Sequence, residues 1–322
     1  MTPTQLRAFA AVVRLGSVKD AAAELDVTEA AVSLHIAKLR KELGDHLFNR
    51  TGAGLAFTPG GLRLASRAAE LLGLQDRTIV EVSQAGNGRR LLRVAGSSLF
   101  AELAAPGLLE LFANRANDLT VELSVHPPAQ FEALLRTRTV DIAVGPDPGL
   151  DPEVISSHRF LNYKLLIVAG RDHPLAGGRA TAAQLRDQIW LLGPSAAADI
   201  GGGSMPTVLQ QLKVPEEHQQ IFQSHAAALE EAKRGKGVAL CASFAVGPDL
   251  AHGDLVRLSV IDTPPNMDGS WSTHTLAGGG VPAVASELVR FAATPRATQA
   301  MLRGSGVNVG RFQPSIHVTL WS

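Results

Sequence analysis

The stretch that most constrains this chain runs from residue 17 to residue 41 and reads SVKDAAAELDVTEAAVSLHIAKLRK. Ser17 and Thr28 predict the starts of two helices joined by a tight turn, because each hydroxyl can accept from an N–H group that the first helical turn leaves unpaired. The first helix is rich in alanine, which allows close contact with a neighbouring helix. The second helix repeats apolar side chains at i, i+4, i+7 and i+11, which predicts one buried stripe: Val32, Ile36, Leu39 and Leu43.

The opposite face of the second helix is predicted to be exposed. At about 100° per residue it carries Ala30, Leu34, Ala37, Lys38 and Lys41, with Ser33 on its shoulder. A short helix pair that presents such a face is what a helix-turn-helix needs to lay its second helix in the major groove of DNA.

The segments on either side extend this pattern. Residues 2–5 form a helix start with a threonine cap, a proline and a glutamine, and Gly16 predicts the end of that helix. Residues 47–50 and 55–57 flank a glycine-containing turn at residues 51–54, which predicts a β-hairpin, or wing.

Thr58 and Pro59 predict the start of a helix that continues to about residue 85, a length of about 40 Å at 1.5 Å per residue. Its apolar seam consists of Leu64, Leu71, Leu72, Ile79 and Val82. Its polar positions are Arg63, Arg67, Glu70, Arg77 and Glu81. Such a helix either packs on its own domain or pairs with a partner helix.

From residue 91 onward, strand-like and helix-like segments alternate, which predicts a parallel sheet covered on both faces and two α/β lobes. The expected strands are 91–95, 121–125, 141–145, 163–169, 190–192, 219–223 and 238–242. The expected helices are 100–114, 128–138, 206–213, 226–234 and 281–293. The tail after residue 302 ends in the apolar segment HVTLW, which is typical of an edge strand but has no predicted place.

The sequence AAAELDVTEAAVSLHIAKLRKELGDHLFNR, followed by FTPGG, resembles the N-terminal region of the LysR-type transcriptional regulators. The resemblance is strong over residues 1–90 and looser over the rest of the chain. It implies a winged helix-turn-helix, a long linker helix and a two-lobed periplasmic-binding-protein-like α/β effector domain. By the resemblance, the chain crosses between the lobes near Tyr163 and returns near Trp271.

The implied domain order is a DNA-binding domain at residues 1–58, a dimerisation helix at 59–88, an effector-binding domain at 89–302 and a C-terminal tail at 303–322. The function that the resemblance implies is sequence-specific promoter binding, controlled by a small molecule in the cleft between the lobes. Its partners would be double-stranded DNA, the effector, a second copy of the chain in a homodimer or homotetramer, and RNA polymerase at the promoter. An effector acts on DNA binding only to the extent that it binds one arrangement more tightly than another.

The candidate DNA-binding residues, Thr28 among them, lie in and beside the second helix. Base-edge contacts are expected from Ala30, Ser33, Leu34 and His35, because a serine hydroxyl serves any base and leucine fits a thymine methyl. Glu29 has two open interpretations, a contact to cytosine or a charge that favours the first helical turn after Thr28. LysR-type proteins commonly carry Gln-Pro at positions 29 and 30, so a different operator sequence is expected here. Phosphate contacts are expected from Lys38, Lys41 and Arg50.

The candidate effector-binding residues follow predicted strands, since ligands of open α/β sheets bind beyond the carboxyl ends of strands. They are Ser97, Ser98, Gly145, Pro146 and Ser195. Ser97 and Ser98 open a helix whose free N–H groups suit a carboxylate or another anion. The plainer interpretation, that Ser97 and Ser195 are only helix caps, stays open beside this one.

Composition supports a non-uniform charge distribution. Formal net charge is zero over 322 residues, but residues 1–67 hold nine Lys or Arg against six Asp or Glu. The lone Cys241 rules out an internal disulfide and fits a reducing compartment, and in an apolar strand it is expected to be a core residue. No signal peptide or membrane-spanning run is evident, so a cytoplasmic protein is expected.

No residue pattern predicts catalysis, a cofactor or a metal site. The sequence has no HExxH motif, no Cys/His spacing suited to zinc, and no GxSxG, Walker A or complete GxGxxG motif. We therefore expect a regulator and not an enzyme. Two alternatives remain at this stage: a solute-binding or enzymatic α/β domain fused to a DNA-binding arm, and an architectural DNA-binding protein that responds to no ligand.

Overall fold

The computed structural model describes residues 1–51, 54–85, 90–177, 179–196, 204–278, 280–303 and 316–319. These residues form two compact units, Met1–Asn87 with Arg136–Thr139, and Gly88–Leu135 with Val140–Ser322. Each unit has its own hydrophobic core.

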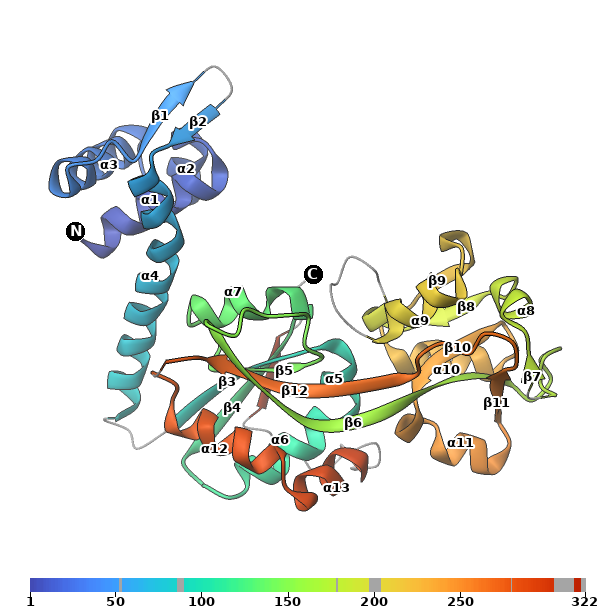
Figure 1. Ribbon diagram of the computed structural model, residues 1–322. Coiled ribbons are helices and arrows are strands. Elements are labelled where there is room, and N and C mark those ends of the chain that lie inside the picture. Colours follow the sequence, from blue (N-terminus) through green and yellow to red (C-terminus); the bar gives the residue numbers. More distant parts are fainter. Residues whose placement is uncertain are drawn as a thin grey trace. The chain divides into compact units, whose positions relative to one another are not determined.

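The first unit begins with three short helices, α1 (Pro3–Leu15), α2 (Val18–Glu24) and α3 (Glu29–Leu43) (Figure 1). The predicted caps are confirmed, since Ser17 Oγ accepts from Asp20 N at 3.3 Å and Thr28 Oγ1 accepts from Ala31 N at 3.2 Å. Gly16 and Gly44 end α1 and α3 with φ of 69° and 66°, a left-handed conformation that favours glycine. The helix-turn-helix expected from the sequence is therefore present.

Most of the predicted stripe of α3 is buried. Val32, Ile36 and Leu39 are at most 3% exposed and pack in the core of this unit. Leu43 was expected in the same stripe, but that prediction is wrong, because its side chain is 44% exposed. It is the last residue of α3, where the chain turns away from the helix axis at Gly44.

The predicted wing is also present. Strands β1 (Phe48–Thr51) and β2 (Gly54–Phe57) pair antiparallel, with Phe48 opposite Phe57. The Phe48 ring lies 6.3 Å from the Phe9 ring of α1 and 5.9 Å from the Phe57 ring, which anchors the hairpin on the core. The predicted turn residues 52 and 53 lie outside the described residues.

The long helix α4 spans Pro59–Ala85, as predicted. Thr58 caps it, because its Oγ1 accepts from Gly61 N at 2.9 Å and donates to the Asp45 carboxylate at 2.6 Å. The polar face differs from the prediction at Arg77, which is buried. The segment Arg136–Thr139 covers this side of α4: a Cβ built on Gly73, one helical turn before Arg77, would lie 1.5 Å from the Thr137 carbonyl oxygen.

The second unit begins with three parallel strands, β3 (Arg90–Gly96), β4 (Leu119–Val125) and β5 (Ile142–Gly145), in the order β4-β3-β5. The helix expected at 100–114 is instead two helices, α5 (Ser98–Leu103) and α6 (Ala105–Ala113). Pro106 explains the break, since proline has no N–H to donate and its ring clashes with the carbonyl four residues earlier. The helix expected at 128–138 is a 3-10 turn, Pro128–Gln130, followed by α7 (Phe131–Arg136).

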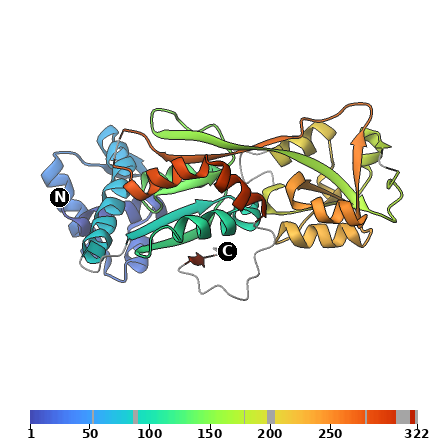
Figure 2. The same ribbon diagram turned by 90° about the horizontal axis from the view of Figure 1, so that it is seen from below.

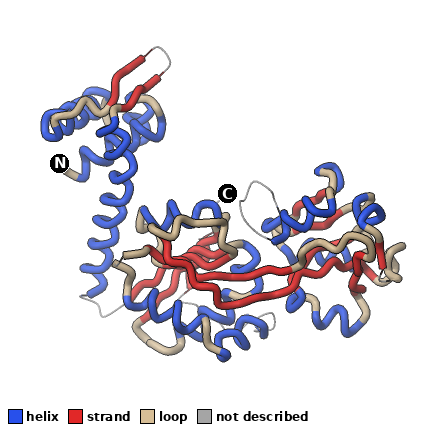
Figure 3. The backbone as a smooth tube through the Cα atoms, in the orientation of Figure 1, coloured by secondary structure: helices blue, strands red, loops and turns tan. Residues whose placement is uncertain are grey.

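Two long antiparallel strands, β6 (Ile155–Gly170) and β12 (Asp268–Leu276), join the two lobes of this unit (Figures 2 and 3). The first half of β6 pairs with β12, and its residues 165–169 pair with β10 (Val238–Ala242). The chain therefore crosses near residue 164 and returns near residue 268, as expected. We call residues 90–135, 140–164 and 268–303 lobe I, and residues 165–267 lobe II.

Lobe II also contains β7, β8, β9 and β11 and helices α8 to α11. Their bounds are β7 (Arg179–Ala180), α8 (Ala182–Arg186), β8 (Trp190–Leu192), α9 (Ser204–Leu212), β9 (Gln219–Ile221), α10 (His225–Lys233), α11 (Gly247–His252) and β11 (Leu255–Val260). The strands expected at 190–192 and 238–242 have the predicted bounds. Strand β8 lies between β10 and β9.

The C-terminal helices return to lobe I, where α12 (Ala283–Ala292) and α13 (Pro295–Arg303) contact α6. Helix α13 was not predicted. The final strand β13 (Ile316–Thr319) pairs parallel with β4 at the edge of the sheet, which gives the apolar tail segment a place. No described helix is long and apolar enough to cross a membrane.

Candidate nucleic-acid interface and effector cleft

The face of α3 that was predicted to contact DNA is open to solvent in this unit. Leu34 is 54% exposed, and the residues around it are also exposed. They are Ala30, Ser33, Ala37, Lys38 and Lys41. The face combines apolar side chains, one hydroxyl and two cations, which can serve a thymine methyl, a base edge and phosphates, respectively.

The other candidate DNA-binding residues differ in their roles. Thr28 and Glu29 are exposed at the start of α3, where the Thr28 hydroxyl already caps the helix. His35 is half-buried on the side of α3. The backbone of Arg50 lies in β1, while its side chain is outside the described part of the chain.

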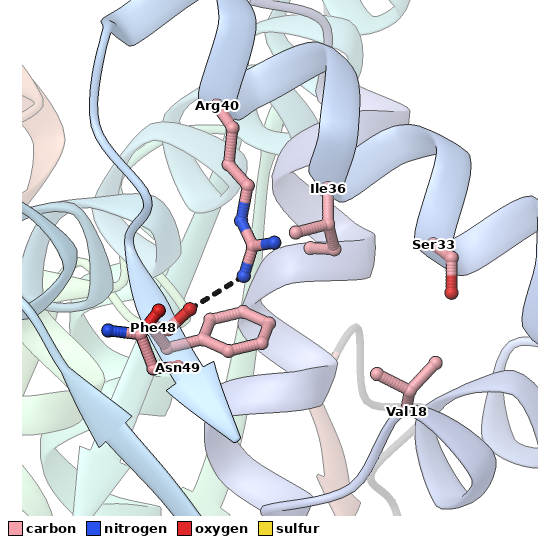
Figure 4. A pocket seen from close by; sticks show the side chains of 6 residues that line it. All are labelled: Val18, Ser33, Ile36, Arg40, Phe48 and Asn49. Carbon is pink, nitrogen blue, oxygen red and sulfur yellow. Dashed lines mark hydrogen bonds between the residues drawn. The ribbon is translucent and has the colours of Figure 1, made fainter.

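A pocket of about 280 Å³ lies beside this face, between α3, the start of α2 and β1 (Figure 4). It is lined by Val18, Ser33, Ile36, Arg40, Phe48 and Asn49. Arg40 Nη2 donates to the Phe48 carbonyl oxygen at 2.6 Å, and the guanidinium lies 4.7 Å from the centre of the Phe48 ring. Arg40 therefore joins α3 directly to the wing.

Arg40 was not among the residues predicted to contact DNA. Its position seven residues after Ser33 places both side chains on one flank of the helix, next to the predicted DNA-contacting face. That spacing was visible, but the partner carbonyl of Phe48 becomes apparent only when the hairpin folds back.

In lobe I, the candidate effector residues Ser97 and Gly145 lie together at the carboxyl ends of β3 and β5. Ser97 is 3% exposed, and its N–H donates to the Val144 carbonyl at 2.9 Å. A Cβ built on Gly145 would lie 3.0 Å from Ser97 Oγ, so glycine allows this close approach. Ser97 Oγ makes no cap hydrogen bond and has no partner among the described residues. The cap interpretation of Ser97 therefore does not apply to its side chain.

Ser98 joins the two lobes. Its Oγ lies 2.7 Å from Ser195 Oγ of lobe II, and Ser195 Oγ also accepts from Leu99 N at 3.2 Å. Ser195 lies in a 3-10 turn, Pro194–Ala196, which follows β8. Pro146 follows Gly145 and is half-exposed. The glycines at 201–203 that follow Ser195 in the sequence lie outside the described residues.

A second bridge between the lobes was missed by the sequence analysis. Glu102 of α5 accepts from His225 N, His225 Nδ1 and Ala226 N at the start of α10, each at 2.8 Å. Burial alone would raise the pKa of Glu102, but the hydrogen bonds from His225 and Ala226 outweigh it and hold this pKa below its usual range. The carboxylate is therefore charged at neutral pH. No local signal marks this pair, because its members are 123 residues apart.

An aromatic cluster lies where the long strands pass from one lobe to the other. Trp271 of β12 is fully buried, with its ring 5.4 Å from Phe100, 5.1 Å from Tyr163 and 5.7 Å from Phe244. Burial also raises the pKa of Tyr163. Through Phe100 of α5 and Phe244 of lobe II, the cluster gives both lobes a shared apolar contact.

One other prediction concerns residue chemistry. Cys241 is 3% exposed in β10, and burial raises the pKa of its thiol to about 12, which fits the predicted core residue. Among the described residues, no group of three or more His, Cys, Asp or Glu side chains is arranged to hold a metal ion.

Two family descriptions match this chain. The first is "Bacterial regulatory helix-turn-helix protein, lysR family" over residues 3–62, and the second is "LysR substrate binding domain" over residues 85–292. An uncharacterized HTH-type transcriptional regulator of Mycobacterium tuberculosis strain H37Rv is 56% identical over 328 residues, which cover 100% of both chains. The HTH-type transcriptional regulator CbbR of Sinorhizobium medicae is 30% identical over 81% of this chain and 83% of that protein.

Solved structures show the same fold. ArgP of Mycobacterium tuberculosis has a TM-score of 0.59 at 23% identity and covers 90% of this chain and 97% of its own. CbnR, in a complex with its target DNA, has a TM-score of 0.54 at 21% identity and covers 90% of this chain and 99% of its own. The chain thus belongs to the LysR family of transcriptional regulators, with a helix-turn-helix region followed by a substrate-binding domain.

Proposed function

We propose that residues 1–58 bind a specific double-stranded DNA sequence, with α3 in the major groove and the β1–β2 hairpin as the wing. The observation that carries this proposal is the exposed face of α3, where Leu34 is 54% exposed among polar and cationic side chains. The fold likeness to CbnR, a relative solved with its target DNA, supports it.

Within this interface we assign direct base contacts to Ala30, Ser33, Leu34 and His35, and either a base contact or a helix-start charge to Glu29. Thr28 caps the helix at the point where it enters the groove. Lys38, Lys41 and Arg50 contact phosphates, which fixes the register of the protein on DNA without reading the sequence.

The linker helix, residues 59–88 in this proposal, pairs with a second copy of the chain. Five apolar residues of α4 are between 42% and 68% exposed, namely Leu62, Leu71, Leu74, Ile79 and Val82. At about 100° per residue the last four lie in one broad stripe on the same side of the helix. Burial of this stripe against its copy gives a homodimer, and dimers can pair further into tetramers.

Residues 89–302 bind a small-molecule effector between lobes I and II, at Ser97, Ser98, Gly145, Pro146 and Ser195. Support comes from the buried Ser97 hydroxyl, which lacks a partner among the described residues, and from Ser98 and Ser195, which meet across the lobes. Effector binding changes the arrangement of the dimer on DNA and so the access of RNA polymerase.

The proposed activity is regulation in the cytoplasm and involves no catalysis or cofactor. Between the lobes, the imidazole of His225 bonds to Glu102 and not to a serine. In lobe I, Ser157 Oγ lies 2.8 Å from His274 Nδ1, but His274 Nε2 has no hydrogen-bond partner among the described residues. A serine nucleophile needs a base that a third group orients, and the described part of the chain gives this pair no such group.

Fluorescence anisotropy with duplex DNA from the region upstream of the protein's own gene tests the DNA-binding half of this proposal. The double variant Ser33→Ala/Lys38→Ala is expected to lose selective binding, while Lys236→Ala, an exposed lysine of lobe II, serves as the control. Unchanged binding by a folded double variant would contradict the assignment of α3 as the reading helix.

A further inference from the structure

The start of α10 in lobe II is capped by a side chain from lobe I. Glu102 Oε2 accepts from His225 N and His225 Nδ1, and Glu102 Oε1 accepts from Ala226 N, all at 2.8 Å. Ser224 of lobe II caps only the next position, where its Oγ accepts from Ala227 N at 3.1 Å. The first two N–H groups of α10 therefore depend on the other lobe for their partners.

The contact between Glu102 and the start of α10 belongs to a strong class of hydrogen bonds. A carboxylate that accepts from the N–H groups at a helix start makes charge-assisted hydrogen bonds and faces the positive end of the helix dipole. The side chains of Glu102 and His225 are only 25% and 4% exposed, so solvent screens the contact weakly.

A second contact between the lobes lies on the same helix. Ser98 and Leu99 of α5 bond to Ser195 at 2.7 and 3.2 Å, and Glu102 is located three to four residues further along α5. Residues three and four apart lie on one helix face, so a single face of α5 carries both bridges to lobe II. The hydroxyls of Ser98 and Ser195, which we assign to the effector site, are thereby bonded to each other.

We propose that Glu102 is a positioning residue that keeps lobe II docked on α5 when no effector is bound. The resting state of the cleft is then closed, and an effector reaches Ser98 and Ser195 only when this contact opens. The inference rests on the effector site proposed above. It adds that a built-in carboxylate, rather than a bound ligand, holds the closed arrangement.

The link between effector binding and the open–closed equilibrium determines how Glu102 affects regulation. An effector that binds only the open arrangement loses apparent affinity in proportion to the closed fraction. Weakening the Glu102 contact should therefore raise effector affinity. It should also populate the effector-bound arrangement of lobes in the absence of effector.

The test measures the distance between the lobes in the full chain without DNA and without effector. Spin labels at Arg290→Cys in lobe I and Lys236→Cys in lobe II replace exposed side chains, while the buried Cys241 is first replaced by alanine. Dilution with unlabelled protein removes distances between protomers. The variants are Glu102→Ala and Glu102→Gln, and Glu110→Gln on the following helix of lobe I is the matched control.

The unaltered chain and Glu110→Gln should give one narrow distance distribution. Glu102→Ala should shift a large fraction to a second, different distance, and exchange of the His225 and Ala226 amides should become at least tenfold faster. Glu102→Gln keeps one oxygen acceptor, so its distance distribution and exchange rates should lie between those of the unaltered chain and Glu102→Ala. If Glu102→Ala does not fold, Glu102→Gln provides the test.

Folded Glu102 variants with the distribution and exchange rates of the unaltered chain would overturn the proposal. Because this test uses neither DNA nor effector, its failure would leave the DNA-binding proposal untouched. Equally, failure to bind DNA would not alter the distances between the lobes.

Discussion

Replacing Arg40 by methionine should loosen the wing without disturbing the recognition helix. Methionine has a similar length and a similar helix propensity, so α3 itself should persist. The variant loses the hydrogen bond from Arg40 Nη2 to the Phe48 carbonyl at 2.6 Å and the stacking on the Phe48 ring at 4.7 Å. It also removes Arg40 Nε, a buried donor without a hydrogen-bond partner among the described residues.

The expected loss of stability of the hairpin in Arg40→Met follows from these three changes. A hydrogen bond from a charged group contributes about 1.5–3 kcal/mol, and a partly exposed cation–π contact contributes about 0.5–1 kcal/mol. Removal of an unpaired buried donor returns about 1–2 kcal/mol. The net loss is about 1–2 kcal/mol, which corresponds to roughly tenfold faster hydrogen exchange in the hairpin.

Hydrogen exchange followed by mass spectrometry is the suitable assay, because residues 1–87 contain no tryptophan or tyrosine that would report on this unit by fluorescence. Peptides that cover β1 and β2 should exchange about tenfold faster in Arg40→Met. The control is Arg14→Met, which removes an exposed ion pair with Glu24 and should change stability by less than about 0.5 kcal/mol.

DNA binding separates this positioning role from a phosphate contact. If Arg40 only holds the wing, Arg40→Met weakens binding but leaves the dependence of the affinity on salt unchanged. If Arg40 touches a phosphate, the slope of log K against log salt falls by about 0.9 for each phosphate that the variant no longer neutralises. Unchanged hairpin exchange, or a reduced salt slope, would refute the reasoning.

Four further results are expected. Lys38→Ala should weaken binding to specific and scrambled duplexes alike. Anisotropy at several salt concentrations should show that the slope of log K against log salt falls by about 0.9 for each phosphate that is no longer neutralised. An unchanged slope would show that Lys38 does not contact a phosphate. Leu39→Ala, at a fully buried position, should cost about 2–5 kcal/mol in hydrogen-exchange stability, whereas Leu34→Ala, at a position 54% exposed, should mainly weaken DNA binding. Desolvation lowers the pKa of the buried His274, against smaller opposing effects of Asp147 and Gly145, so protonation of this imidazole favours unfolding. In urea titrations the second unit should therefore lose stability as the pH falls below about 6.5. The loss should be smaller in His274→Gln. Cys241 should resist a thiol reagent in the folded protein and react on unfolding, because its thiol is buried.

The features that were predicted correctly from the sequence depend on neighbours along the chain. The caps at Ser17 and Thr28 and the stop at Gly16 each involve residues within four positions, so their chemistry is readable locally. The exposed face of α3 follows from the helical period in the same way. The error at residues 100–114 was also local, because Pro106 marks the helix break that the prediction ignored.

The features that were missed depend on distant residues. Arg77 is buried because residues 136–139 cover that side of α4, and nothing near Arg77 indicates this contact. Glu102 reads as an ordinary helix-surface residue until α10 meets it. Of the proposed effector residues, Ser98 and Ser195 meet in the structure, but their pairing across 97 positions could not be derived from periodicity.

The account depends most on selective DNA binding by this chain. The direct measurement is the ratio of the dissociation constants for the duplex upstream of its own gene and for a scrambled duplex of equal length, at about 0.15 M salt, where specific affinities typically exceed non-specific ones by at least about 10³. The account predicts a ratio of this order, with binding to both duplexes weakening steeply as salt rises. Equal affinity for both duplexes, or no binding by the folded protein at low salt, would contradict it.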